Sequence, residues 1–175
     1  ILKSAANHRV PVRIAHSHNA KQDMNWKYPI KIFYKRFIPK YATILWACGK
    51  EAGDWMFNGA PYQIINNAID ASAYTYNPSK RAQMRQQLGL TNEFTIGHVG
   101  RFNPQKNHPF LLDIFASLLK QVPNTELLLV GGGEDMPKIQ AKAQSLGIES
   151  HVRFLGVRSD VADLMQAMDV FVFPS

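Results

Sequence analysis

The chain has 175 residues, of which 46% are hydrophobic and 19% are charged, and this composition is typical of a soluble globular protein. It lacks the run of about 18 apolar residues that an integral membrane protein requires. Its single cysteine, Cys48, excludes an internal disulfide and fits a reducing, cytoplasmic location. The net charge of +7 is concentrated at the start, because residues 1–45 hold nine Lys or Arg and one acid, Asp23.

The first 75 residues predict a small α/β unit. Short apolar runs favour strands at Val12–Ala15, Thr43–Ala47 and Tyr62–Ile65, and the pattern of Lys50–Phe57 favours a helix that Asn58-Gly59 ends. Residues 66–80 are rich in turn-forming residues and are expected to hold a hinge.

The rest of the chain alternates short apolar runs with helical periodicity, which is typical of a parallel sheet with crossover helices. Helices are expected after Asn107 or His108, near Asp135, and after Ser159 or Asp160. Four runs are mostly apolar and four to six residues long, as strands buried on both faces should be. These predicted strands are Phe94–Val99, Glu126–Val130, Val152–Leu155 and Val170–Phe173.

Two predicted strands end in loops whose residues suit a phosphate group. After Val99 come Gly100, Arg101 and, before a helix, Lys106, which place a planar donor fork and a point charge at the carboxyl edge of a strand. After Val130, Gly131 and Gly133 favour either a simple tight turn or backbone NH groups that face a nucleotide phosphate. The spacing alone is equally consistent with Arg101 and Lys106 being exposed surface cations that bind no ligand.

Seven short motifs follow one another along the chain. They are Arg13 to Asn19, Ala47-Cys48, Asn66-x-x-x-Asp70, Gly100-Arg101 with Lys106-Asn107, Val130-Gly131-x-Gly133, Phe154-Leu155-Gly156 and Met168 to Ser175. In their order and spacing these motifs resemble the family 4 retaining glycosyltransferases. The resemblance covers nearly the whole chain and is closest to bacterial capsule and exopolysaccharide enzymes.

The resemblance implies a GT-B fold, an α/β architecture with parts of two Rossmann-like domains and parallel sheets. Residues 1–75 would be the C-terminal part of the acceptor-side domain plus the hinge, and residues 76–175 the N-terminal part of the nucleotide-sugar domain. The implied activity is a hexosyl-type transfer, with retention, from a nucleotide-diphosphate sugar to a glycan or polyprenyl-linked acceptor.

By the same resemblance, Arg101 and Lys106 would neutralise the donor diphosphate, and no metal cofactor is expected. The backbone near Gly156, Val157 and Arg158 would contact the base. His16 and His18 would lie near the transferred sugar as catalytic candidates. From the residues alone, a His-x-His metal site or ordinary hydrogen-bonded histidines stay open for this pair.

The cations between Lys31 and Lys40 are interleaved with apolar side chains, which suits peripheral contact with an anionic membrane, here the inner membrane face. A solvated helix face is the alternative for this segment. For the function, the alternatives are a sugar-nucleotide epimerase of the same fold and a basic nucleic-acid-binding module. No RNA-binding signature accompanies the basic residues, so nucleic acid is not an expected partner.

The chain begins Ile1-Leu2-Lys3, without an initiator Met or a signal peptide, and it is expected to be an internal fragment. In the family, a Glu-x7-Glu motif that holds the donor sugar follows the Pro-Ser found here at Pro174-Ser175. We therefore expect the 175-residue chain alone to be inactive.

Overall fold

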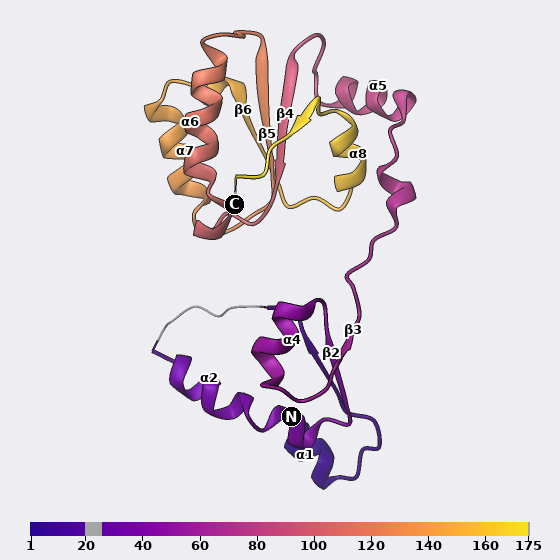
Figure 1. Cartoon of the computed structure of the whole chain (residues 1–175). Helices are drawn as coiled ribbons and strands as arrows, with labels where there is room; N and C mark the ends of the chain where they lie inside the picture. The colour runs from indigo at the N-terminus through magenta and orange to yellow at the C-terminus, as the bar shows by residue number, and fades with distance from the viewer. Residues whose placement is uncertain (20–25, 175) are drawn as a thin grey trace. The chain divides into compact units, whose positions relative to one another are not determined.

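The computed structural model describes residues 1–19 and 26–174, so Lys21 and Asp23 of the basic segment and Ser175 of the last motif lie outside the described residues. The chain divides into two compact units, Ile1–Ile69 and Asp70–Ser175 (Figure 1). This boundary precedes the expected one because the 3₁₀ turn η1, Ala71–Tyr74, packs against a helix of the second unit.

The first unit has a parallel sheet of order β1-β2-β3. Its buried core centres on Ala47, Ala52 and Phe57, with Cys48 and Tyr62 packed against them. In chain order its elements are α1 Leu2–Asn7, β1 Ile14–Ser17, α2 Tyr28–Lys35, α3 Ile38–Tyr41, β2 Ile44–Ala47, α4 Lys50–Phe57 and β3 Gln63–Ile64.

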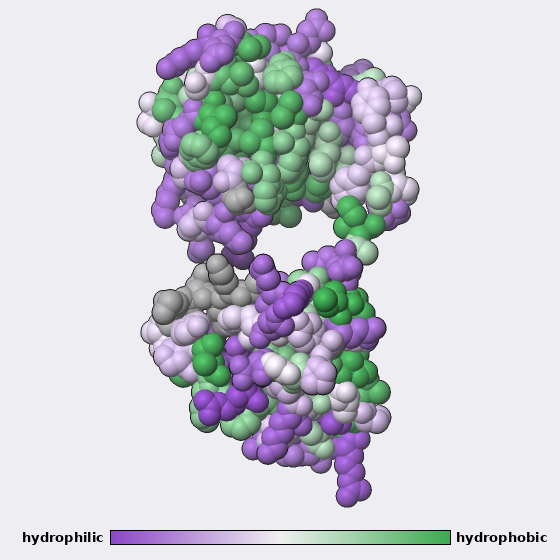
Figure 2. All heavy atoms as spheres, in the orientation of Figure 1, coloured by the Kyte–Doolittle hydropathy of each residue, from purple (hydrophilic) through white to green (hydrophobic). Residues whose placement is uncertain are grey.

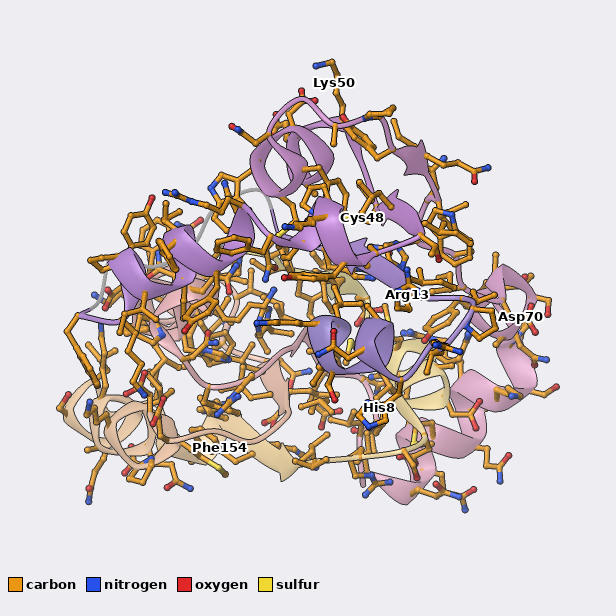
Figure 3. The ribbon with its side chains drawn as sticks, turned by 90° about the horizontal axis from the view of Figure 1, so that it is seen from below. His8, Arg13, Cys48, Lys50, Asp70 and Phe154 are labelled. Carbon is orange, nitrogen blue, oxygen red and sulfur yellow. The ribbon has the colours of Figure 1, made fainter. Side chains whose placement is uncertain are left out.

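The first strand begins two residues later than predicted. Arg13 lies just before it and is held by side-chain contacts, since its Nε donates to the Tyr41 carbonyl at 2.6 Å and its backbone N donates to Thr43 Oγ1 at 2.8 Å (Figure 3). The helix predicted at Lys50–Phe57 forms with those bounds, and Asn58 at its end adopts a left-handed φ of 49°. Helices α1 to α3 were not predicted from periodicity, and none of them contains a fully buried residue.

The second unit is a four-stranded parallel sheet of order β6-β5-β4-β7. Helices α6 and α7 cover one face and α5 and α8 cover the other (Figure 1). Its elements are α5 Pro78–Gln87, β4 Phe94–Val99, the 3₁₀ turn η2 Pro104–Lys106, α6 His108–Leu119, β5 Thr125–Val130, α7 Met136–Ser145, the 3₁₀ turn η3 Glu149–His151, β6 Val152–Gly156, α8 Val161–Gln166 and β7 Val170–Phe171.

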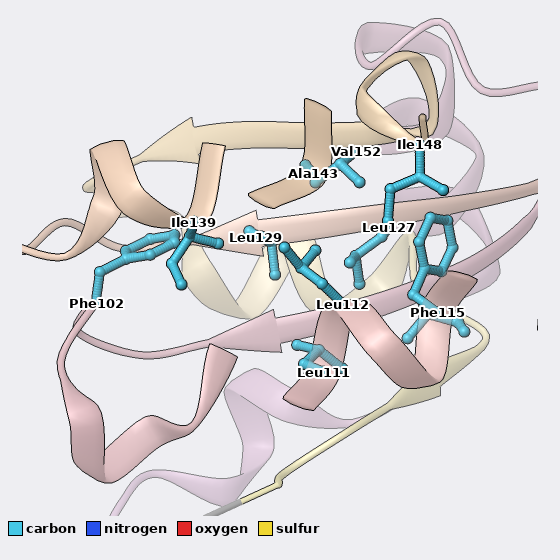
Figure 4. Packing of buried hydrophobic residues seen from close by; sticks show 11 residues of the cluster. Phe102, Leu111, Leu112, Phe115, Leu127, Leu129, Ile139, Ala143, Ile148 and Val152 are labelled. Carbon is cyan, nitrogen blue, oxygen red and sulfur yellow. The ribbon is translucent and has the colours of Figure 1, made fainter. Parts of the chain in front are cut away.

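One hydrophobic cluster of this unit lies between the sheet and helices α6 and α7 (Figure 4), and a second lies on the face that α5 and α8 cover. Phe102, Leu112, Phe115 and Leu127 have no exposed surface. Every residue of β5 is buried, as expected for a central strand that is covered on both faces. This core fixes the strands and therefore the loops at their carboxyl ends.

Three of the four predicted strands are confirmed within one residue, and the α/β class with parallel sheets is confirmed. The last strand is shorter than predicted, because its ladder with β4 ends at the pair Gly97 and Phe171. Helix α5 was missed, since Met84 is its one buried apolar residue and a single residue gives no amphipathic stripe.

Candidate functional site

Loops at the carboxyl ends of β4, β5 and β6 meet at one edge of the second sheet. The Gly100 N–H donates to Val130 O at 2.9 Å, and the Gly131 N–H donates to Gly156 O at 2.8 Å. After β4 the chain adds β5 and β6 on one side and then returns to add β7 on the other. The carboxyl ends of β4 and β7 are therefore the topological switch point, where open parallel sheets bind ligands.

The glycines after β5 are required by backbone packing. A Cβ on Gly131, whose φ is 139°, would lie 2.0 Å from Gly100 O, and a Cβ on Gly133 would lie 2.4 Å from Phe102 O. The Phe102 N–H also donates to Gly132 O at 3.0 Å. This close approach of two loops accounts for the glycines structurally and leaves their contact with a phosphate a prediction.

The loop from Gly100 to Asn107 presents the two cations. Its anchor is the fully buried Phe102, and the Asn103 side chain accepts from the Lys106 backbone N–H at 3.2 Å. Arg101 is exposed and has no ion pair in the described part of the chain. Lys106 is half-buried, with Nζ 4.2 Å from the ring centroid of Phe173. Both cations lie near the start of α6, where the helix dipole also favours an anion.

Beneath this loop lie two histidines, His98 and His108, that the sequence did not indicate as part of a site, although His108 was one of the two residues expected to cap the helix. His98 and His108 are almost completely buried, their ring centroids are 4.8 Å apart, and His108 stacks on Phe102 at 4.2 Å. Burial lowers the pKa of His98, and burial with the neighbouring His98 lowers the pKa of His108 to about 4. Both rings are thus neutral near pH 7. Their positions at a strand end and a helix start carry no periodic signal that marks them as buried.

The turn after β6 places the three residues expected to contact a base. Gly156 has a left-handed φ of 68°, and Val157 is 83% exposed. Arg158 is already paired, because its Nε and Nη2 donate to the Asp160 carboxylate at 2.8 and 2.6 Å. These bonds lower the pKa of Asp160 and raise that of Arg158. The Arg158 side chain thus pairs with Asp160 while it stays exposed, and contact of this turn with a base stays a prediction.

In the first unit, His16 and His18 lie side by side at the end of β1. Their ring centroids are 4.1 Å apart and both residues are exposed. Ser17 points to the opposite face, where its Oγ donates to Ala52 O at 2.8 Å. The edge of the Trp46 ring faces His16 at 6.0 Å. Across the described residues no cluster of three or more potential metal ligands forms.

Residues 80–175, just over half of the chain, match the family model described as glycosyl transferases group 1. The chain belongs to this family. Among curated proteins, EpsF of Bacillus subtilis is 35% identical over 95% of this chain and 46% of its own length. A UDP-Gal:alpha-D-GlcNAc-diphosphoundecaprenol alpha-1,3-galactosyltransferase of Escherichia coli is 29% identical over 64% of this chain and 30% of its own.

Among solved glycosyltransferase structures, Anabaena HepE in complex with UDP and glucose superposes with a TM-score of 0.80 at 26% identity. The match covers 98% of this chain and 48% of HepE. The group 1 chain described here thus spans about half the length of EpsF and HepE. Where described, it contains no helix with the length and apolarity needed to span a bilayer.

Proposed function

We propose that the complete protein transfers a hexosyl group, with retention, from a nucleoside-diphosphate sugar to a glycan or polyprenyl-linked acceptor. The proposal rests on the placement of Arg101 and Lys106 beside the start of α6, at the switch point of a group 1 glycosyltransferase domain. The exposed Arg101 guanidinium, which has no ion pair among the described residues, and the Lys106 ammonium on a fixed loop match the charge of a diphosphate.

In this proposal the two cations stabilise the charge that develops on the leaving diphosphate, so that no metal cofactor is needed. The backbone at Gly131 and Gly133 approaches the phosphates, and the turn from Gly156 to Arg158 receives the base. HepE, which was solved with UDP, supports a nucleotide ligand for this chain.

His16 and His18 are proposed to contact the transferred sugar. Their exposed, paired rings at a strand's carboxyl end offer hydrogen-bonding nitrogens on one surface. Units Ile1–Ile69 and Asp70–Ser175 would then be parts of the acceptor-side and donor-side domains. The Escherichia coli relative, whose name includes a diphosphoundecaprenol acceptor, supports a lipid-linked acceptor.

The deciding experiment incubates the complete protein with UDP- and GDP-sugars, with and without glycan and polyprenyl-diphosphate-linked acceptors. We expect a glycosylated acceptor whose new linkage keeps the donor's anomeric configuration. Consumption of the sugar nucleotide into an epimer in the absence of any acceptor would contradict the proposal and indicate an epimerase of the same fold.

A further inference from the structure

A continuous series of side-chain contacts runs from the buried end of β4 to Lys106. His98 has no exposed surface, and its Nδ1 lies 2.8 Å from Val172 O. The Phe173 ring follows at 5.9 Å between ring centroids. The Lys106 ammonium then lies 4.2 Å from the centroid of that ring. The His98 imidazole thus hydrogen-bonds to the segment after β7 and lies beside the Phe173 ring on which the Lys106 ammonium rests.

The hydrogen bond of His98 holds the chain where it leaves β7. The last ladder pair of β4 and β7 is Gly97 with Phe171, and the Val172 N–H still donates to Gly97 O at 2.9 Å. Beyond that point the described ladder stops, and the His98 imidazole supplies the next bond. Because a carbonyl oxygen only accepts, Nδ1 must carry the proton, which leaves Nε2 unprotonated in the neutral ring.

The same imidazole also lies against the loop from Gly100 to Asn107. A Cβ on Gly100 would lie 2.8 Å from His98 Nε2 and 3.3 Å from Lys106 Cγ, so the absent side chain leaves room for both. His108, at the start of α6, packs against His98 with the two rings in a T-shaped arrangement. His98 is therefore confined by the loop, by α6 and by the chain after β7.

We propose that His98 is a positioning residue for Lys106, which it holds through the Val172 carbonyl and the Phe173 ring. The inference rests on the proposed role of Lys106 at the donor diphosphate. Without the bond to Val172 O, the segment that carries Phe173 keeps only the Val172 N–H bond to Gly97 O beyond the ladder, and the aromatic support of Lys106 is held less firmly. Small misplacements of a charge that stabilises a transition state reduce the rate strongly.

The test is a double-mutant cycle in the complete enzyme with a nucleotide-sugar donor. His98→Phe keeps an aromatic ring but removes the donor to Val172 O, and it should lower kcat/KM about tenfold or more. His98→Asn retains an amide N–H near the Nδ1 position and should recover most of that loss. In a Lys106→Met background, His98→Phe should have an effect of less than about twofold, since the residue that it positions is gone.

A matched control is His151→Asn, because His151 lies in η3 before β6, at the opposite edge of the sheet. It should leave kcat/KM unchanged. Thermal unfolding of each variant separates loss of fold from loss of positioning. If His98→Phe does not fold, His98→Gln replaces it, since its longer side chain places the amide near the Nε2 position.

An equal loss from His98→Phe with and without Lys106 would show a purely structural role and overturn the inference. An unchanged kcat/KM in His98→Phe would do the same. These outcomes leave the proposed function standing, because Lys106→Met alone must still lower kcat/KM. If Lys106→Met has no effect, the proposed donor site itself is wrong, and the inference is wrong with it.

Discussion

At the scale of single residues, Arg101 gives the most direct test of the donor site. It is exposed and without an ion pair among the described residues, so its removal leaves no buried charge behind. Arg101→Ala in the complete enzyme should weaken transition-state stabilisation by about 2 to 4 kcal/mol, as measured by kcat/KM. Lys120→Ala, an exposed cation at the far end of α6, is the control and should have no effect. An equal kcat/KM for the two variants would show that Arg101 is not part of the donor site.

His108 makes the stability of the second unit depend on pH. Its pKa is lowered to about 4 by burial and by His98, with Lys106 adding to the shift and Asp135 opposing it. As the pH falls below about 6.5, the unfolded chain binds a proton at this residue and the folded chain does not, so stability is lost progressively down to about pH 4. The full loss from this group is about 3 kcal/mol.

Urea unfolding at pH 7 and pH 4.5 measures this effect. His108→Phe retains the stacking on Phe102 and should lose less stability on acidification than the unmodified protein does. His151→Asn should behave as the unmodified protein, since His151 is a partly exposed histidine. Identical pH dependence in His108→Phe would show that His108 is not the buried neutral group described here.

At the scale of elements, Arg85 joins α5 to the rest of the second unit. Its side chain is 11% exposed and its guanidinium donates to four oxygens, those of the Thr95 hydroxyl and of the Ala167, Thr91 and Glu93 carbonyls, at 2.9 to 3.1 Å. Asp169 Oδ2 lies 3.6 Å away. Arg85→Met would leave two buried acceptors, Thr95 Oγ1 and Ala167 O, and two partly buried carbonyls without this donor, and it should lower the free energy of unfolding by about 3 to 5 kcal/mol.

Lys80→Met is the matched control on the same helix. Lys80 pairs with Asp163 at 2.6 Å, but both side chains are at least 40% exposed, so the loss should stay below about 1 kcal/mol. Urea unfolding compares the two variants. If they lose similar stability, α5 is held by something other than the Arg85 contacts.

Helix α2 carries the surface expected to meet a membrane. Ile30, Phe33 and Tyr34 are about half exposed or more, whereas Lys35 donates to Trp55 O and is thereby turned toward α4. Lys31 and Arg36 stay exposed at this surface. We expect the complete protein to float with anionic vesicles at low salt, and Lys31→Glu with Arg36→Glu to weaken binding about tenfold or more.

The control is the double variant Lys120→Glu with Lys138→Glu, which changes the net charge by the same amount but on the second unit. Vesicles without anionic lipid should not recruit the protein, and rising salt should release it. Equal flotation of the two double variants would show that Lys31 and Arg36 do not make the membrane contact.

At the scale of the whole molecule, we expect the 175-residue chain alone not to transfer sugar. The proposed donor and acceptor residues belong to different units, and the chain spans about half the length of EpsF and HepE. The second unit also exposes hydrophobic surface over α6 and β7, including Phe110, Phe171 and Phe173, which favours self-association (Figure 2).

Product formation by this chain is to be compared with that of a version extended beyond Ser175. Weak binding of UDP by the chain, detected by calorimetry and lost in Arg101→Ala, should persist without turnover. Turnover equal to that of the extended protein would show that the catalytic groups lie elsewhere in the chain.

Local sequence signals were enough to predict three of the four strands of the second unit within one residue, their parallel arrangement and the loops that end them. These features depend on local signals, namely apolar runs such as Leu127 to Val130 and the glycines that follow. The order of the motifs along the chain also sufficed to indicate the family. Arg101 and Lys106 could be named as candidates because they directly follow a predicted strand.

The surroundings of Arg101 and Lys106 became apparent only in the folded structure. His98 meets Val172 across 74 positions, and Arg85 meets Ala167 across 82, so neither contact leaves a local pattern. Helix α5 and the early end of β7 could not be predicted from the sequence either. Helix α5 is anchored by the buried Arg85, and the β4–β7 ladder ends where the His98 side chain takes over the hydrogen bonding. Periodicity records which face of an element is apolar, whereas hydrogen bonds between polar side chains and distant carbonyls exist only once the chain has folded.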